Sequence, residues 1–139
     1  MPGYSEVKMF YRYGGSFIGT MLDTNKWVKM YQSPKLEFIV NQDCWWNTET
    51  GFADIILPAS TNFERNDIGE WGNTGGYSHH GSASCNHRVI VYQQKCIEPL
   101  FESKPDYQIF VDLADRLGVK EEYTEGNTAE DWIEKMFYD

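Results

Sequence analysis

Two short apolar runs, separated by a polar segment, form the clearest pattern of hydrophobic and polar positions along the chain. The first run, residues 36–40 (LEFIV), ends at the polar residues 41–43, and the second, residues 53–57 (ADIIL), ends at Pro58. Short runs rich in β-branched residues and bounded by polar or proline positions predict buried strands. Because a short crossover joins the two strands, we expect them to lie parallel in one sheet.

Polar side chains follow both predicted strands. Gln42 and Asp43 come directly after the first strand, and Glu64, Arg65 and Asp67 come after the second. In open α/β sheets, ligands bind outside the carboxyl ends of the strands. The pattern therefore predicts a ligand site at this edge of the sheet.

The N-terminal part of the chain predicts a strand, a tight turn and a helix. Residues 7–13 are rich in aromatic side chains and end at Gly14 and Gly15, where the backbone can approach a ligand closely. Apolar residues at helical spacing then predict a helix over residues 20–32. Strand, helix, strand, crossover and strand in this order are typical of a doubly wound α/β fold.

The segment after the second apolar run has a different character. Residues 66–84 are rich in glycine and show no period, which predicts a long functional loop, and residues 88–93 predict a further strand. Ser103 and Asp106 form a capping-box pattern that predicts the start of a helix ending at Gly118.

A second capping-box pattern, Thr128 and Asp131, predicts a last helix over residues 128–137. Taken together, the elements predict an α/β fold with a mostly parallel sheet and helices on both faces, similar to a dinucleotide-binding domain. We expect residues 1–139 to form one such domain, because the length of 139 residues is typical of a single domain.

Charge and hydropathy exclude several classes of function. The formal net charge is −9, which argues against binding nucleic acid or an anionic membrane by bulk electrostatics. No apolar run approaches the roughly 20 residues that a membrane-spanning helix needs. The first residues have neither a basic nor an apolar signal-peptide region, so the sequence leaves the compartment open, with the cytoplasm favoured.

The three cysteines, Cys44, Cys85 and Cys96, give little support for a disulfide or a zinc site, and buried or half-buried free thiols are expected. A metal site made of Cys85 and His87 with the nearby His79 and His80 is an alternative, but the spacing matches no standard zinc pattern. We therefore assign no metal ligand in this chain.

Three segments resemble the dimethyl sulfoxide reductase family of molybdopterin oxidoreductases: FADIILPASTNFERNDI, CIEPLFESKPDYQIFVDLADRLG and YTEGNTAEDWIEKMF. The segments VKMFYRYGGSFIGTM, NKWVKMYQSPKLEFIVNQ and CNHRVI are similar to a transhydroxylase branch of that family, which acts on polyhydroxylated aromatics. The resemblance covers nearly the whole chain.

The resemblance implies a cofactor and partners. Catalytic subunits of this family are several times longer than the present chain and hold molybdenum or tungsten between two molybdopterin guanine dinucleotides. This chain would be the part that binds one guanine dinucleotide, and its partners would be the remaining domains of the subunit and an iron–sulfur electron-transfer subunit. The metal-ligating side chain lies elsewhere in such subunits, so we do not expect this chain to turn over substrate by itself.

The resemblance also implies the cofactor contacts, which are Gly15, Ser16, Thr20, Gln42, Asp43, Arg65 and Asp106. Ser16 stands where family members often have Asn, and Thr20 stands where the reductases have His. Carboxylates can accept hydrogen bonds from ribose or guanine, and an arginine offers a planar fork to a pyrophosphate. Purely structural roles remain open, because Asp106 could cap its helix and Arg65 could pair with a neighbouring carboxylate.

Tyr77, in the glycine-rich segment, is our candidate for a catalytic residue that lines the substrate funnel. The leading hypothesis is thus a cofactor-binding part of a transhydroxylase-like enzyme. The alternatives are a reductase of S- or N-oxides and a stand-alone nucleotide-binding module without catalysis.

Overall fold

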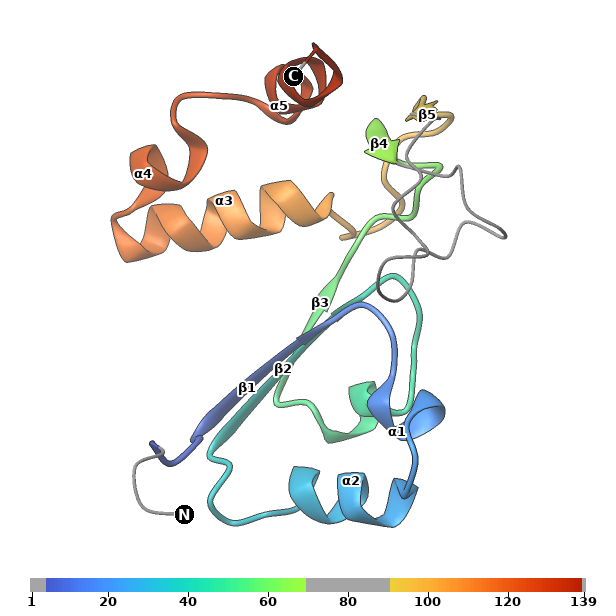
Figure 1. Cartoon of the computed structure of the whole chain (residues 1–139), viewed down its shortest axis with the longest axis vertical. Coiled ribbons are helices and arrows are strands. Elements are labelled where there is room, and N and C mark those ends of the chain that lie inside the picture. The colour runs from blue at the N-terminus through green and yellow to red at the C-terminus, as the bar shows by residue number, and fades with distance from the viewer. Residues whose placement is uncertain (1–4, 70–90, 139) are drawn as a thin grey trace. The chain divides into compact units, whose positions relative to one another are not determined.

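The computed structural model of the chain describes residues 5–69 and 91–138 (Figure 1). The chain divides into two compact units, unit 1 of residues 1–59 and unit 2 of residues 60–139. Unit 1 carries a parallel sheet with helices, which confirms the predicted α/β class. The segment with Tyr77, His79, His80, Cys85 and His87 lies outside the described residues.

The sheet of unit 1 has three parallel strands in the order β1-β2-β3, which are β1 (Met9–Tyr13), β2 (Phe38–Asp43) and β3 (Ile55–Pro58). In the register, Tyr13 lies opposite Gln42 and Asp43 lies opposite Pro58. The carboxyl ends of all three strands therefore meet at one edge, as Figure 1 shows for β1 and β2. The expected parallel pair is present, but β2 begins later and extends through the polar residues that we expected to follow it.

Two helices, instead of the single helix predicted over residues 20–32, connect β1 to β2: α1 (Phe17–Thr20) and α2 (Thr24–Tyr31). Asp23 interrupts them with a left-handed backbone, φ 62°. Aspartate tolerates this conformation better than most residues, because its short side chain can bond locally. The break lets α1 start directly after the Gly14–Gly15 turn, which matters for the site below.

The core of unit 1 forms between these helices and one face of the sheet. Ile18, Tyr31 and Ile39 are buried together, from α1, α2 and β2 respectively. The Tyr31 ring stacks on Phe52, with ring centroids 5.4 Å apart, and Phe52 ends the short 3-10 helix η1 (Glu49–Phe52). This packing fixes the crossover between β2 and β3 on the same side as the helices.

Unit 2 contains a short antiparallel pair and three helices. The pair is β4 (Asp67–Gly69) with β5 (Val91–Gln93), and the helices are α3 (Asp106–Leu117), α4 (Lys120–Thr124) and α5 (Ala129–Tyr138). Neither β4 nor α4 was expected from the sequence. Both are so short that the chain offers no period to detect.

The helix ends of unit 2 test the capping predictions. Gly118 ends α3 with φ 75°, and Thr128 and Asp131 exchange side-chain and backbone hydrogen bonds of 2.7–3.2 Å, so both predictions are confirmed. The capping box predicted at Ser103 is wrong: the cap position of α3 is Pro105, and no side chain caps it.

Two further observations concern residues that the structure describes. Cys44 and Cys96 are exposed, so the expectation of buried or half-buried thiols is wrong for both. Within the described ranges, no helix combines the length and the apolar character that crossing a membrane requires.

Candidate functional site

The site in unit 1 starts from the tight turn after β1. The Gly14 N–H donates to the carbonyl of Gln42 at 2.9 Å, so the turn is fixed to the end of β2. Both Gly14 (φ 57°) and Gly15 (φ 66°) have left-handed backbones, which side chains other than glycine rarely adopt. A Cβ on Gly15 would lie 3.0 Å from Nη2 of Arg12, so a side chain there would push on the guanidinium.

Glu49 organises the residues that follow the turn. Its carboxylate accepts from the Ser16 hydroxyl at 2.5 Å and from the Ile18 N–H at 2.8 Å, and its side chain is fully buried. The Ser16 oxygen also accepts from the Gly19 N–H at 2.9 Å, which caps α1. The hydroxyl of Ser16 is thus committed to the fold, and what Ser16 can offer a ligand is its backbone N–H.

The same carboxylate affects a neighbouring phenol. Burial raises the pKa of Tyr31 to about 12, and the negative charge of Glu49 adds to this shift. The positive charge of Arg12 acts in the opposite direction on the Tyr31 pKa. Glu49 and Arg12 therefore both lie near this ring, although no ion pair within 4.0 Å joins them in the described part of the chain.

The other predicted contacts of unit 1 lie around the turn with partners of their own. The Thr20 hydroxyl donates to the Ser16 carbonyl within α1. The Gln42 side chain is fully buried and accepts from the Tyr11 hydroxyl at 2.5 Å. Both side chains therefore support the turn and the strand end in this conformation.

Asp43 is the carboxylate at the sheet edge itself. One of its oxygens accepts from the Trp45 N–H at 3.0 Å, and the other accepts from the Asn47 side chain at 2.7 Å. Asn47 also donates to the Gly15 carbonyl at 3.4 Å, so it joins the end of β2 to the turn. Asp43 is only half-buried, which leaves its oxygens reachable for an additional donor.

An open hollow of about 530 Å³ lies beside these groups. Its lining comes from the start of α1 and from the crossover: Ser16, Gly19, Trp46, Asn47, Thr48 and Gly51. The lining combines small residues, amide and hydroxyl groups and one exposed indole, on which a flat heterocycle could stack.

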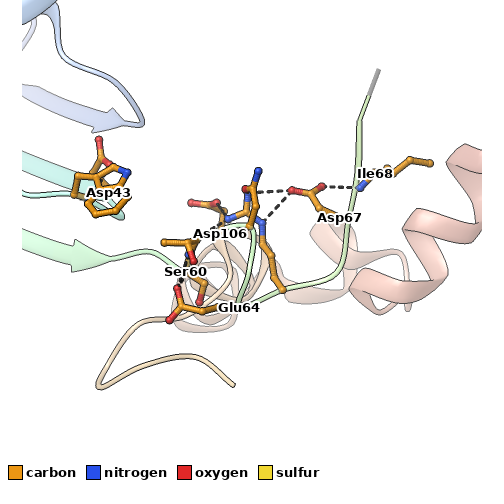
Figure 2. A network of polar contacts seen from close by, with 10 residues as sticks. Asp43, Ser60, Glu64, Asp67, Ile68 and Asp106 are labelled. Atoms are coloured by element: carbon orange, nitrogen blue, oxygen red, sulfur yellow. Dashed lines mark hydrogen bonds and ion pairs between the residues drawn. The ribbon is translucent and has the colours of Figure 1, made fainter. Parts of the chain in front are cut away.

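Unit 2 carries the other two predicted contacts, and it brings them together. The Arg65 guanidinium lies 3.1 Å from a carboxylate oxygen of Asp106 and 3.0 Å from one of Asp67. It also donates to the Ser60 carbonyl at 2.6 Å and to Asn62 at 3.1 Å. Figure 2 shows this network, in which the other oxygen of Asp67 accepts from the Ile68 N–H.

Glu64, next to Arg65, holds the segment on which that network depends. Its carboxylate accepts from the Thr61 hydroxyl and N–H, both at 2.7 Å, and from the Leu100 N–H at 2.7 Å. These bonds, with a weaker one from Ser103 at 3.3 Å, lower the pKa of Glu64 to about 2. The turn after β3 is thereby joined to the segment that leads into α3.

Sequence reasoning missed Glu49 and Arg12 as members of these sites, whereas Glu64 was among the polar residues expected after the second strand. Glu49 and Glu64 are charged residues that the fold buries, and buried carboxylates are rare enough to be informative once burial is known. The signal in the sequence was position: Arg12 lies at the end of a predicted strand, and Glu49 lies in the crossover between the next two predicted strands.

The sequence model of the molybdopterin oxidoreductase family matches residues 1–116. The chain belongs to this family. The predicted membership is therefore confirmed. In the described residues, no cluster of three or more histidine, cysteine or carboxylate side chains could hold a metal ion.

Individual relatives agree with the family assignment. The chain is 51% identical to the pyrogallol hydroxytransferase large subunit of Pelobacter acidigallici over 136 residues, which are 98% of this chain and 16% of that protein. It is 40% identical to the dimethyl sulfoxide/trimethylamine N-oxide reductase of Rhodobacter capsulatus and 42% identical to the trimethylamine-N-oxide reductase of Haemophilus influenzae. These two matches cover 98% and 96% of this chain and 15% of each relative. The chain thus spans about one sixth of the length of these relatives.

Proposed function

We propose that this chain binds the guanine dinucleotide part of a molybdopterin cofactor, as one portion of a larger molybdenum or tungsten enzyme. The observation that carries the proposal is the Gly14–Gly15–Ser16 turn, which the end of β2 holds at the carboxyl edge of a parallel sheet. This is the edge at which α/β sheets bind nucleotides.

The residues at this edge fit an anionic dinucleotide. Among the described residues, no acceptor is bonded to the backbone N–H groups of Gly15, Ser16 and Phe17. Free N–H groups in a tight turn form a concave donor surface for phosphate. The open hollow next to the turn offers space for a heterocycle, and Asp43 offers a carboxylate to ribose or guanine donors.

Arg65 and Asp106 are proposed as further contacts to the guanine end. Their mutual pairing orients the Asp106 carboxylate, and a guanine that presents two adjacent donors would meet an already positioned acceptor. Arg65 would then act mainly by holding Asp106, because its own donors already face Asp67, Asn62 and the Ser60 carbonyl.

For the whole enzyme we propose a transhydroxylase-like activity on polyhydroxylated aromatics, since the hydroxytransferase of P. acidigallici shares 51% identity with this chain. The alternative is reduction of an S- or N-oxide, as the names of the other relatives suggest. When bound, the metal–pterin centre would supply hydroxyl or oxygen-atom transfer, and this chain would bind and orient the cofactor. Tyr77 stays proposed as a substrate-lining residue, and Tyr77→Phe should lower turnover of the whole enzyme.

The test of cofactor binding is a titration of the isotopically labelled chain with GDP, followed by backbone and side-chain NMR shifts. We expect saturable shifts at Gly15, Ser16, Asp43 and Asp106. The matched control is Asp112→Asn, which removes a carboxylate of α3 that pairs with Lys104 away from the proposed contacts, whereas Asp106→Asn should weaken binding. Equal affinity for GDP and ADP would contradict the guanine assignment, and would leave a general nucleotide-binding module as the better description.

A further inference from the structure

The side chain of Arg12, at the end of β1, is in an unusual state for an arginine beside a turn. Its Nη1 donates to the Tyr13 carbonyl at 3.1 Å, which is its only hydrogen bond to the described residues. Its Nε is buried without any partner. By contrast, Lys8, Lys26 and Lys35 of the same unit each pair with a carboxylate. A guanidinium carries five donors, so most of those of Arg12 are uncommitted.

Packing nevertheless holds this guanidinium in place. Its Cζ lies 4.1 Å from the centroid of the Phe17 ring, and Phe17 stacks on Trp27 with centroids 4.7 Å apart. A cation stacked on an aromatic face keeps the edge of its plane available to acceptors. The layered order of Arg12, Phe17 and Trp27 therefore positions the donors before any ligand arrives.

The position of Arg12 relative to the turn indicates which kind of ligand would bind there. A Cβ on Gly15 would come within 3.0 Å of Nη2, so the guanidinium lies directly against the turn, in which the N–H groups of Gly15 and Ser16 have no acceptor among the described residues. Uncommitted N–H groups and an uncommitted cation at one place favour a group with several anionic oxygens. A neutral ligand would leave the positive charge without a partner.

We propose that Arg12 is a phosphate-binding residue, which forms with the backbone of Gly15 and Ser16 a subsite for the pyrophosphate of a dinucleotide. The inference rests on the proposed function for the identity of the whole ligand, but the subsite itself requires only a phosphate. It gives Gly15 a specific role, because any side chain there would displace the guanidinium. It also explains how a chain with net charge −9 attracts an anion at this edge.

The test uses inorganic pyrophosphate as the probe. Titration of the labelled chain should give saturable shifts at the Arg12 side-chain N–H groups and at the amides of Gly15 and Ser16. Arg12→Gln should weaken pyrophosphate binding by about tenfold or more, as expected for loss of charge-assisted hydrogen bonds. Arg12→Lys keeps the positive charge but loses the planar fork of donors, so its affinity for pyrophosphate should lie between those of the unchanged chain and Arg12→Gln.

The matched control is Lys29→Gln, which removes one positive charge from the exposed end of α2 and should change the affinity less than twofold. Equal weakening by Arg12→Gln and Lys29→Gln, or no saturable shift in the unchanged chain, would overturn the proposal. Amide spectra that match outside the turn would show that the variants are folded. If pyrophosphate binds through Arg12 while GDP binds no tighter than pyrophosphate, the guanine assignment fails and the phosphate subsite stands.

Discussion

The two units of the chain each contain a buried carboxylate and an arginine at the site, but the arginine has different contacts in the two units. In unit 1, Glu49 holds the start of α1 while Arg12 keeps most of its donors uncommitted. In unit 2, Glu64 holds the turn after β3 while Arg65 is surrounded by Asp67, Asp106 and backbone or amide oxygens. The same residue types therefore give one region with spare positive charge and another in which the charge is internally neutralised.

The difference teaches what each arginine can do. A guanidinium already bonded to two carboxylates must lose those bonds before it meets a phosphate, so Arg65 is better suited to position Asp106 than to bind an anion. Arg12 has no such bonds to lose. The buried carboxylates, in contrast, are alike, because each one satisfies backbone donors that the fold removes from water.

The largest expected effect on stability comes from removing the buried carboxylate of Glu49 in unit 1. Glu49→Ala leaves the Ile18 N–H and the Ser16 hydroxyl without their acceptor inside the fold, and should lower the local stability of unit 1 by about 2–4 kcal/mol. Hydrogen exchange of the β2 amides measures this loss.

The control is Glu37→Ala, which removes the exposed partner of Lys8 and should cost about 0.5 kcal/mol or less. Equal protection of the β2 amides in both variants would show that Glu49 does not organise the turn.

The second effect is acid sensitivity of the segment that Glu64 holds. Because hydrogen bonds lower the Glu64 pKa from its ordinary value of 4.5 to about 2, its stabilising contribution is complete above the unfolded pKa. It is lost as the pH falls from about 4.5 to about 2. When the melting temperature is plotted against pH, Glu64→Gln should therefore reduce the fall in melting temperature between about pH 4.5 and pH 2. An unchanged fall in the variant would contradict the assignment of this carboxylate.

A structural feature could be predicted from the sequence when the residues that determine it are close together in the chain. The strands and their parallel pairing followed from short apolar runs and their spacing, which are properties of neighbouring residues. Gly118 and the Thr128–Asp131 box were predictable for the same reason, since each helix end is determined within one turn.

The capping box at Ser103 failed because a distant residue competes for it. Glu64, which lies 39 residues earlier, accepts from the Ser103 hydroxyl and from the Leu100 N–H, and Asp106 pairs with Arg65 instead of returning to a cap. A local motif cannot report a carboxylate that arrives through the tertiary fold.

The residues of the candidate site could be predicted only in part. Family resemblance named Gly15, Ser16 and Asp43, and the structure places them around one turn and strand end. Glu49 and Arg12 were missed, because a lone charge in a crossover or on a strand suggests a solvated side chain. Their burial and partners decide their roles, and both depend on how α1 packs against the crossover.

The third effect compares the two arginines directly. Arg65→Gln breaks contacts to two carboxylates and the Ser60 carbonyl, and should destabilise unit 2 by about 1–2 kcal/mol, measured by hydrogen exchange of α3. Arg12→Gln loses a single hydrogen bond and a stacking contact, and should destabilise unit 1 by about 1 kcal/mol or less. If the two variants reversed this order, Arg12 would be a structural residue and the contrast between the regions would not hold.

The smallest effect is the titration of Tyr31. Burial and the charge of Glu49 raise the Tyr31 pKa from 10.0 to about 12, so the folded state keeps its proton while the unfolded chain releases it. Stability should therefore fall between about pH 10 and pH 12, with the slope that one proton gives. The difference in phenolate absorbance between the unchanged chain and Tyr31→Phe isolates this group from the other tyrosines.

Glu49→Gln should lower the Tyr31 pKa and Arg12→Gln should raise it, because the two charges act on the ring with opposite signs. If both variants shifted the Tyr31 pKa in the same direction, the shifts would reflect a general loss of packing in unit 1. The charges of Glu49 and Arg12 would then not act separately on the ring.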